Sequence, residues 1–320
     1  MNAFTNDRMA SMETGIIVKG INNIFTVKTP EGLTRLCRIK GKQLESIKGE
    51  YNALAVGDRV LYSPVGEKEG MITERLERRN SFVRYNSKTQ SNQTVVANVD
   101  LIICVCSVDS PPFRPRFVDR VLACTQGSEV MIVLNKCDID ITEDDYKRYK
   151  LYGKLGYRCM PVSAQTGESL DKLRKLIKGK TVAFVGQSGV GKSSLINILL
   201  GTDQRVGDIN QKYNTGNHTT NHAIMLEGPD YTIIDTPGVR EFVPPQDDPA
   251  NIAHAFPEFT EPAERCQYTG CLHIDEPGCA VKALVESGKI DGDRYESYLR
   301  IVETMRSKDP IWKRPCTSEQ

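Results

Sequence analysis

The sequence has almost no net charge and no long apolar run. Its 320 residues carry 42 Lys and Arg against 41 Asp and Glu, so the formal net charge is +1. A chain this balanced has no overall field for or against nucleic acid, and any such contact must rest on local patches. No apolar stretch approaches the ~20 residues of a membrane-spanning helix. The N-terminal residues MNAFTNDRMASMETG also lack the basic-then-apolar pattern of a signal peptide.

Cysteine is plentiful, but its distribution does not indicate disulfides. Of the ten cysteines, three cluster with a histidine, and Cys316 lies close to the C-terminus. The other six are scattered through predicted core strands and helices: Cys37, Cys104, Cys106, Cys124, Cys137 and Cys159. This pattern is typical of a reducing cytoplasm and one metal site. We therefore expect a cytoplasmic monomer that does not enter a membrane.

The rhythm of the chain predicts a multidomain α/β protein. Between residues 13 and 80, five short strand-like runs separated by turns indicate a small antiparallel β-barrel. From about residue 95, strands alternate with helices, which predicts a mainly parallel sheet covered on both faces. After about residue 245 the pattern is helical and irregular. We expect domains at 1–85, 86–245 and 246–320, with QSNQTVVAN (90–98) as a linker.

GQSGVGKS (186–193) matches the phosphate-binding pattern G-x4-G-K-[ST] between the strand TVAFV and the helix SLINILL. Its glycines allow backbone N–H groups to approach phosphates at a helix N-terminus. Lys192 is expected to stabilise the phosphates in catalysis, and Ser193 to bind Mg²⁺. The alternative is a plain glycine-rich turn. The predicted nucleotide-binding residues here are Gly186, Gln187, Ser188, Gly189, Val190, Gly191, Lys192, Ser193 and Ser194.

NKCD (135–138) and SAQTG (163–167) each follow a predicted strand and predict a guanine site. The Asp138 carboxylate can accept two hydrogen bonds from the guanine N1–H and N2–H₂ edge, which adenine lacks. The Ala164 N–H would approach guanine O6. A simpler alternative for SAQTG alone is a helix N-cap at Ser163 or Thr166. The predicted base-site residues are Asn135, Lys136, Cys137, Asp138, Ser163 and Ala164.

DTPG (235–238) predicts the segment that senses the γ-phosphate. Asp235 would hold the Mg²⁺ shell through water, and the Gly238 N–H would contact the phosphate. The polar segment 207–223 before it has the composition of a switch loop. Either Thr219 or Thr220 can supply a second Mg²⁺ hydroxyl, and the sequence leaves this choice open.

The residue after DTPG is Val239, where many GTPases carry the glutamine that orients the attacking water. His218 is the nearest substitute, since an imidazole can orient or deprotonate water near neutral pH. The alternative is that His218 only packs or contacts a partner. In both cases we expect slow intrinsic hydrolysis that a partner accelerates.

Four metal ligands lie close together in RCQYTGCLHIDEPGCAV. Cys266, Cys271, His273 and Cys279 form a Cys-x4-Cys-x-His-x5-Cys pattern, and three thiolates with one imidazole make a closed tetrahedral site for one structural Zn²⁺. The alternatives are a disulfide with an unpaired thiol, or ordinary buried cysteines.

Local signals for nucleic acid are weaker. Residues 1–85 hold fourteen Lys and Arg against ten Asp and Glu. Cations beside aromatics suit phosphate contacts and base stacking, although a solvated basic face is the favoured interpretation on these residues alone. They are Arg75, Arg78, Arg79, Phe82, Arg84 and Tyr85, and the tail IWKRP (311–315) is similar.

In the order NKCD, SAQTG, GQSGVGKS, DTPG the base motifs precede the phosphate loop, which they usually follow, and this order indicates a circularly permuted GTPase. With a barrel before it and the zinc segment after it, the chain resembles the bacterial ribosome small subunit-dependent GTPase A family. ERRNSFVR (77–84) and GNHTT (216–220) also resemble that family's patterns, with Asn217 in place of a basic residue.

This resemblance implies an N-terminal OB-fold β-barrel, a circularly permuted P-loop GTPase and a C-terminal helical zinc-binding domain. It also implies late maturation of the 30S ribosomal subunit, stimulation of GTP hydrolysis by that subunit, and binding to 16S rRNA. It favours His218 as the hydrolytic residue.

The predicted function is therefore Mg²⁺-dependent hydrolysis of GTP to GDP and phosphate. Two other functions stay open: an RNA-binding module that uses GTP as a structural or regulatory ligand, and a metabolic P-loop kinase. NKCD and SAQTG argue against the kinase. Because DTPG runs almost directly into the zinc segment, we also expect the nucleotide to reposition the C-terminal domain.

Overall fold

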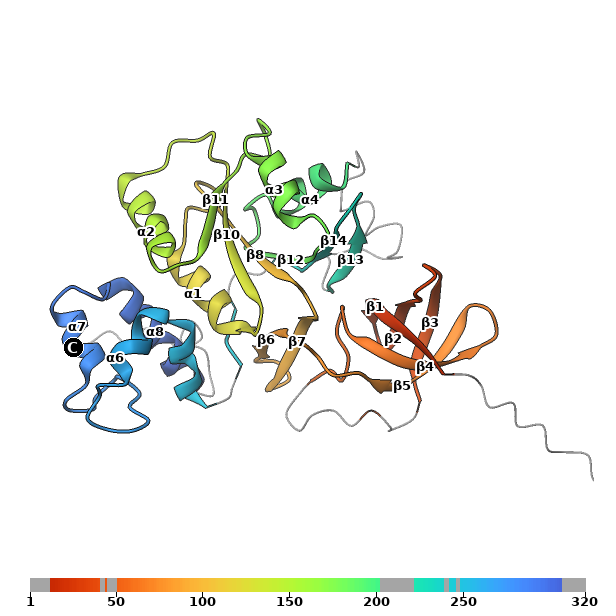
Figure 1. Ribbon diagram of the computed structural model, residues 1–320, viewed down its shortest axis with the longest axis horizontal. Coiled ribbons are helices and arrows are strands. Elements are labelled where there is room, and N and C mark those ends of the chain that lie inside the picture. The colour runs from red at the N-terminus through yellow and green to blue at the C-terminus, as the bar shows by residue number, and fades with distance from the viewer. Residues whose placement is uncertain are drawn as a thin grey trace, which may run out of the picture.

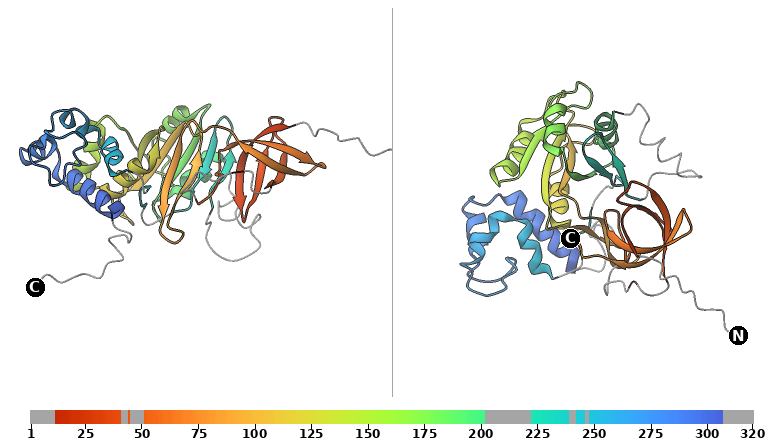
Figure 2. Two further views of the ribbon diagram at one scale, coloured as in Figure 1. Left: turned by 90° about the horizontal axis from the view of Figure 1, so that it is seen from below. Right: turned by 45° about the vertical axis from the view of Figure 1, so that its right-hand side comes forward.

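The computed structural model describes residues 12–40, 44, 51–201, 222–238, 242–245 and 248–306. Three parts follow one another along its long axis: a barrel at one end, a sheet with helices in the centre and a helical part at the other end (Figure 2). Several residues discussed above lie outside the described ranges, namely His218, Thr219, Thr220, Val239, Cys316 and the tail 311–315.

The N-terminal part is a closed β-barrel whose first strand pairs with both the second and the fourth. Valine, isoleucine and aromatic side chains alternate inward, and Ile17, Val27 and Tyr62 are fully buried in its core. The predicted barrel is confirmed, and its strand order is that of a five-stranded OB-fold. Its strands are β1 (Glu13–Ile21), β2 (Ile24–Lys28), β3 (Thr34–Ile39), β4 (Arg59–Val65) and β5 (Glu69–Arg75).

One pairing in the barrel is parallel, so the prediction of a purely antiparallel barrel was wrong. β3 and β5 run in the same direction, from Leu36 beside Glu69 to Ile39 beside Ile72. The reason is closure: β4 pairs with β1, so β5 fills the space between β4 and β3 and meets β3 running the same way.

A second small sheet connects the barrel to the centre. β7 (Ser91–Ala97) pairs with β6 (Ser81–Asn86), and β6 also pairs with β9 (Thr125–Gln126). The prediction of a linker at 90–98 was therefore wrong, because Thr94 and Val96 alternate into a buried layer, as strand residues do. The predicted boundary after residue 85 falls within β6.

The central sheet has the strand order β11-β10-β8-β12-β14-β13. All pairings from β11 to β14 are parallel, while β13 runs antiparallel to β14. The prediction of a mainly parallel sheet is confirmed. Its strands are β8 (Leu101–Ser107), β10 (Glu129–Asn135), β11 (Arg158–Pro161), β12 (Thr181–Gly186), β13 (Ile224–Glu227) and β14 (Thr232–Asp235).

Helices cover both faces of this sheet (Figure 1). In β8, Ile102 and Cys104 point to one face and Leu101 and Ile103 to the other, so the strand is apolar throughout. The first face packs against α1 (Pro115–Cys124) and α2 (Glu143–Lys154), and the second against α3 (Leu170–Ile177) and α4 (Lys192–Leu200).

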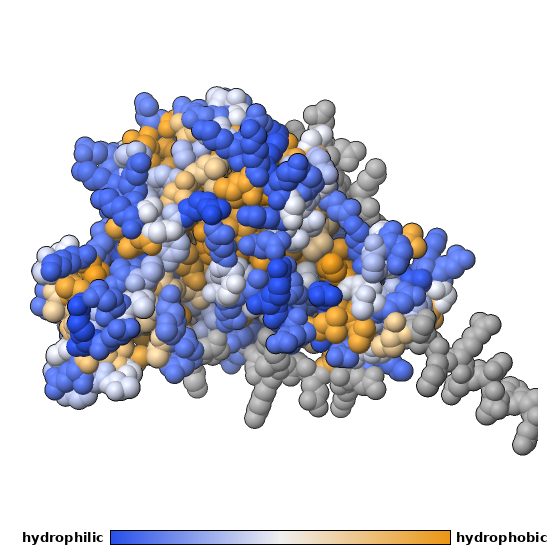
Figure 3. Space-filling view, viewed as in Figure 1, coloured by the Kyte–Doolittle hydropathy of each residue, from blue (hydrophilic) through white to orange (hydrophobic). Residues whose placement is uncertain are grey.

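The C-terminal part has its own aromatic core. Phe256, Phe259 and Tyr298 are fully buried, with ring centroids 5.1 to 5.4 Å apart. The elements are η1 (Pro249–Ala255), α6 (Pro257–Ala263), α7 (Ala280–Glu286) and α8 (Gly292–Arg306). Mostly polar side chains cover the face of the molecule in Figure 3, with small apolar areas between them. In the described part of the chain, no helix has both the length and the apolar character to cross a membrane.

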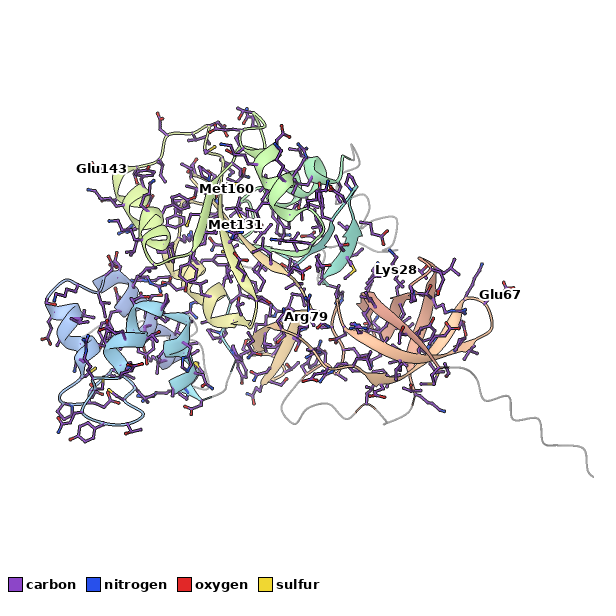
Figure 4. The ribbon with its side chains drawn as sticks, in the orientation of Figure 1. Lys28, Glu67, Arg79, Met131, Glu143 and Met160 are labelled. Atoms are coloured by element: carbon purple, nitrogen blue, oxygen red, sulfur yellow. The ribbon has the colours of Figure 1, made fainter. Side chains whose placement is uncertain are left out.

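The barrel joins the central sheet through β13. Lys19 of β1 pairs with Ile224 of β13, so the strands of the barrel and of the central sheet form one 11-stranded sheet. Lys28 of β2 forms an ion pair with Glu227 at the end of β13, and Figure 4 shows Lys28 on the side of the barrel nearest this strand. β13 is therefore held by the barrel on one side and by β14 on the other.

A buried ionic network joins the central and C-terminal parts. Arg294 of α8, only 2% exposed, donates to both carboxylate oxygens of Glu258 in α6, at 2.8 and 3.1 Å, and also to Asp119 in α1. The Tyr152 hydroxyl of α2 donates to the same Asp119 carboxylate at 2.6 Å. The guanidinium lies 4.3 Å from the centre of the Phe256 ring. Burial raises the pKa of Asp119, and the Arg294 charge opposes this.

We predict that Arg294→Ala lowers the free energy of unfolding by about 3–5 kcal/mol, because it leaves two carboxylates buried without their cation. Urea unfolding followed by circular dichroism measures this. The control is Arg300→Ala on the same helix, which removes a more exposed pair with Glu296 and should cost about 0.5 kcal/mol. Equal losses in the two variants would contradict the prediction.

Candidate nucleotide-binding site and metal centre

The four predicted nucleotide loops meet at one edge of the central sheet. Residues 135–138 follow β10, 163–167 follow β11, 186–193 follow β12 and 235–238 follow β14. These strands run parallel in one sheet, with β8 between β10 and β12, so their carboxyl ends lie at the same edge. Proximity of the loops therefore does not depend on their order along the chain.

Asn135 connects three of these loops. Its side chain is 1% exposed, and its amide Nδ2 donates to the Val190 carbonyl of the phosphate loop at 2.9 Å. Its Oδ1 accepts a hydrogen bond from the Ala164 N–H at 3.1 Å. The carboxamide thus fixes the distance between the base loops and the phosphate loop. The Ala164 N–H that was expected to face guanine O6 bonds to this oxygen in the structure.

The phosphate loop requires glycine where it passes Asn135. Gly191 has φ +86°, a left-handed conformation that favours glycine. A Cβ at this position would lie 2.2 Å from Asn135 Nδ2, which is too close for any side chain. Gly189 has the same φ and passes the Ser110 carbonyl, with 3.2 Å to a hypothetical Cβ.

Asp138 is exposed and held by the neighbouring loop. The Ser163 hydroxyl donates to its Oδ1 at 2.5 Å and accepts from the backbone N–H of Gln165 and Thr166 at 3.2 and 3.0 Å. Ser163 therefore orients the carboxylate and closes its own loop. The alternative of a helix N-cap at Ser163 or Thr166 was wrong, because α3 begins at Leu170 and its N-cap position is Ser169.

Lys136 reaches a loop that was not predicted to belong to the site. Its φ is +63°, and its ammonium donates to the carbonyls of Asp109 and Ser110 at 2.7 and 2.8 Å. These residues follow β8, whose carboxyl end lies between those of β10 and β12. The turn-forming run Asp-Ser-Pro-Pro directly after that strand was the signal that could have identified them. Cys137 is fixed through its N–H, which donates to Val162 O at 3.1 Å.

Lys192 and Asp235 form a buried ion pair beneath the phosphate loop. Burial raises the pKa of the Asp235 carboxyl, and the Lys192 ammonium opposes that rise. Ser193 and Ser194 are exposed in the first turn of α4, whose N-terminal N–H groups carry partial positive charge. The arrangement places one cation, one carboxylate and a helix N-terminus around the same small space.

The DTPG segment is docked against the phosphate loop. The Thr236 hydroxyl donates to the Phe184 carbonyl of β12 at 2.7 Å. Gly238 faces the phosphate loop so closely that a Cβ on it would lie 3.5 Å from Ser188 N. The segment predicted to sense a γ-phosphate therefore lies directly beside the loop predicted to bind it.

The four predicted metal ligands converge in the C-terminal part, and their ligand atoms all lie within 4.8 Å of one another. Cys266 Sγ is 3.9 Å from Cys279 Sγ, and His273 Nδ1 is 3.6 and 3.4 Å from these two sulfurs. A tetrahedral Zn²⁺ with ordinary bond lengths separates its ligands by roughly 3.5–3.8 Å, so the cluster fits that ion. The sulfur separation is far beyond the ~2.05 Å of a disulfide, and the cysteines of the described residues are free thiols.

Backbone contacts hold the ligand loop in place. The Glu276 carboxylate accepts from the N–H groups of Leu272 and Ile274 at 2.9 and 2.8 Å. Tyr295 and Tyr298 of α8 donate their hydroxyls to the carbonyls of His273 and Leu272, both at 2.7 Å. The sequence reasoning missed these three residues. Glu276 lies in the loop itself, whereas Tyr295 and Tyr298 reach it only because the fold brings α8 there.

Phe82, Arg78 and Arg79 of the basic and aromatic cluster near residue 80 make contacts within the fold. Phe82 is fully buried and packs edge-on against Phe242 at 5.0 Å. Arg78 donates to both carboxylate oxygens of the buried Asp58, at 2.7 and 2.8 Å, and Arg79 pairs with Asp100 at 2.9 Å. The interpretation of interleaved phosphate and base contacts was therefore wrong for Phe82 and Arg78, because both side chains are used in contacts within the fold.

Comparisons with known proteins extend over almost the whole chain. Residues 75–243 match the family described as RsgA GTPase. A protein of Borrelia garinii named small ribosomal subunit biogenesis GTPase RsgA is 36% identical over 295 residues, which cover 91% of this chain and 96% of the relative. A protein of the same name from Chlorobaculum tepidum is 37% identical over 309 residues, with 91% and 98% covered.

Two solved structures resemble the fold. The crystal structure of YjeQ from Thermotoga maritima has a TM-score of 0.66 at 30% identity, covering 93% of this chain and 99% of that one. The crystal structure of YloQ, described as a circularly permuted GTPase, has a TM-score of 0.66 at 26% identity, with 96% and 99% covered.

We predict that Asn135→Ala weakens binding of GDP and GTP about equally, by tenfold or more. The change leaves the Val190 carbonyl and the Ala164 N–H without their partner, at about 1 kcal/mol or more for each. Titration with a fluorescent guanine nucleotide measures the affinity. Gln165→Ala, at the exposed position next to Ala164, should bind nucleotide like the wild type. An unchanged affinity for Asn135→Ala would show that the three loops do not depend on this side chain.

Proposed function

Because the chain belongs to the RsgA GTPase family, we propose that its GTP hydrolysis serves late maturation of the 30S ribosomal subunit. The resemblance of its motifs to this family and the permuted order of its GTPase loops are confirmed by the comparisons. The observation that carries the proposal is the convergence of all four nucleotide loops at one sheet edge, three of them joined through Asn135. Relatives covering nearly the same length are named for small-subunit biogenesis.

The base-site residues support selection of guanine. Ser163 holds the exposed Asp138 carboxylate at the entrance to the base loops, where it accepts the paired N–H donors of guanine. Adenine would leave the carboxylate without these donors, which is costly. Asn135, Lys136, Cys137, Ser163 and Ala164 shape the surrounding pocket.

The Lys192–Asp235 pair supports a division of charge when nucleotide binds. The Lys192 ammonium would turn to the β- and γ-phosphates with the N–H groups of the phosphate loop. The Asp235 carboxylate and the Ser193 hydroxyl would hold Mg²⁺, which neutralises charge on the phosphates when bound. Without nucleotide, each of these two side chains neutralises the buried charge of the other.

The hydrolytic step rests on residues outside the described ranges. We propose His218 as the residue that orients the attacking water, since Val239 has no polar group for this. Either Thr219 or Thr220 supplies the second hydroxyl for Mg²⁺. An incomplete site of this kind makes hydrolysis depend on the small subunit, with 16S rRNA as the contacted component. The protein would act as a cytoplasmic monomer.

The Cys266, Cys271, His273 and Cys279 cluster is proposed to hold one structural Zn²⁺. Four protein ligands leave no open position, so the ion would supply rigidity and no chemistry. Its ligand loop packs on α8, and Arg294 of α8 contacts α1 of the GTPase part. The zinc would in this way also support the position of the C-terminal helices.

We predict that Lys192→Ala reduces GTP hydrolysis by about 10²-fold or more, because the phosphate charge loses its cation. Phosphate release is measured for wild type and variant, each with and without 30S subunits. Wild-type hydrolysis should rise with the subunit, and the exposed α3 variant Lys172→Ala should behave like wild type.

Two outcomes would contradict the proposal. Hydrolysis that is unchanged in Lys192→Ala would remove the phosphate loop from the mechanism. Wild-type turnover that is negligible even with 30S subunits would favour an RNA-binding module that uses GTP only as a ligand.

We predict that the purified protein contains about one zinc per chain and that Cys271→Ser loses most of it. Elemental analysis measures the metal, and limited proteolysis after chelation should cut the segment 264–290 first, because the ligand loop loses its cross-link. Cys159→Ser, a half-buried thiol of β11 outside the cluster, should retain full zinc content. Zinc-free protein with a protease-resistant C-terminal part would contradict the assignment.

A further inference from the structure

A cavity of about 490 Å³ lies where the barrel, the β6–β7 sheet and the DTPG segment meet. The barrel contributes the β1–β2 turn at Asn22 and Asn23. Tyr51 also lines the cavity and lies beside β7, where its N–H donates to the Asn92 carbonyl at 2.7 Å. Arg84 of β6 and Gln93 of β7 form a second wall, and Thr236 and Pro237 a third. The cavity is therefore separate from the space between the phosphate loop and the base loops, but it borders one of the four nucleotide loops.

Arg84 brings a positive charge into this cavity without an acidic partner. Its Nε and Nη2 donate to the neutral amide oxygen of Gln93, at 3.3 and 3.1 Å. Within the described ranges no carboxylate pairs with it, whereas Arg78 and Arg79 pair with Asp58 and Asp100. Burial lowers the pKa of Arg84, as expected for a guanidinium that lacks a nearby anion. Arg84 therefore remains available to an anion that enters the cavity.

We propose that this cavity binds one nucleotide of a single-stranded RNA segment, with its phosphate on Arg84. A guanidinium recognises phosphate through two parallel N–H···O bonds, and Gln93 holds it from the other side. The volume is within the usual range of ligand pockets, while an RNA duplex is too wide to enter. Tyr51, which lines the cavity, is 56% exposed, and an exposed aromatic ring can stack on an unpaired base.

The position of the cavity connects RNA to the nucleotide switch. Thr236 is bonded to Phe184 O, and the adjacent Gly238 lies against Ser188 of the phosphate loop. The barrel wall of the cavity includes Ile21 and Gly20 of β1, the strand that pairs with β13. A bound nucleotide would therefore contact the barrel and DTPG at the same time. This inference rests on the proposed function, since the small subunit supplies the RNA, and it names the residue through which that RNA acts.

The test measures binding of a fluorescein-labelled single-stranded RNA of about ten nucleotides to the full chain by fluorescence anisotropy at several salt concentrations. Arg84→Gln should weaken binding tenfold or more, since it removes a charge-assisted contact. It should also reduce the slope of log affinity against log salt by about 0.7, the value for one phosphate on a single strand. Arg79→Gln, which removes the same charge outside the cavity, should weaken binding much less.

Gln93→Glu separates binding from folding. The new carboxylate would lie beside the Arg84 guanidinium, so the protein should melt at the same or a higher temperature. The RNA phosphate would then meet a neutralised pair, and affinity should fall as far as in Arg84→Gln. A purely structural role for Arg84 predicts a stable Gln93→Glu variant with wild-type RNA binding, and that result would overturn the proposal.

Two further experiments separate RNA binding from binding of free phosphate, and failure of the cavity proposal from failure of the proposed function. If inorganic phosphate binds in an Arg84-dependent manner but the RNA does not, the site is not an RNA site. Without 30S subunits, Arg84→Gln and Gln93→Glu should hydrolyse GTP at the wild-type rate. With 30S subunits, the stimulation of hydrolysis should be several-fold smaller in both variants than in the wild type. Stimulation that is intact in both variants would overturn the cavity proposal alone. A wild-type protein that 30S subunits do not stimulate would overturn the proposed function.

Discussion

Parallel pairing of β11, β10, β8, β12 and β14 is the constraint on which the functional part of this protein depends. It places the carboxyl ends of the strands at one edge, so that four short loops meet there in spite of their permuted order. Asn135 then fixes the spacing between the base loops and the phosphate loop with two hydrogen bonds. Gly191 permits this contact, because any side chain at that position would displace the Asn135 amide.

The two flanking parts are attached to the central sheet by different kinds of contact. The barrel continues the sheet through the β1–β13 pairing and the Lys28–Glu227 ion pair. The C-terminal helices are joined through the buried ion pairs of Arg294 with Asp119 and Glu258. Separating these groups would leave buried charges without a partner, which is strongly destabilising. Repositioning of the C-terminal helices by the nucleotide stays a prediction. The Arg294 contacts favour movement of the central and C-terminal parts as one body, with adjustment on the β13 side.

The basic cluster near residue 80 illustrates the limit of local sequence reasoning. Charges and aromatics that alternate along a strand suit either a binding face or a set of internal contacts. Arg78 proved to be internal because Asp58, distant in the sequence, reaches it in the fold, and Arg79 forms an exposed ion pair with Asp100. Arg84 is also an arginine, but its guanidinium donates to the neutral amide of Gln93 and the residue lines a cavity.

Local motifs were enough to predict the loops that meet at one sheet edge, the Cys and His side chains that converge in the C-terminal part, and the alternation of strands and helices. Glycine geometry, ligand chemistry and apolar periodicity act over a few residues, so they can be read from neighbours in the chain. Tertiary structure alone decided the parallel β3–β5 pairing, the strand at 91–97, the Lys136 contact with the Asp109–Ser110 loop and the support of the metal loop by α8. Each of these depends on which distant segment pairs with a strand edge or lies opposite a polar group. A pattern of neighbouring residues carries no information about that distant segment.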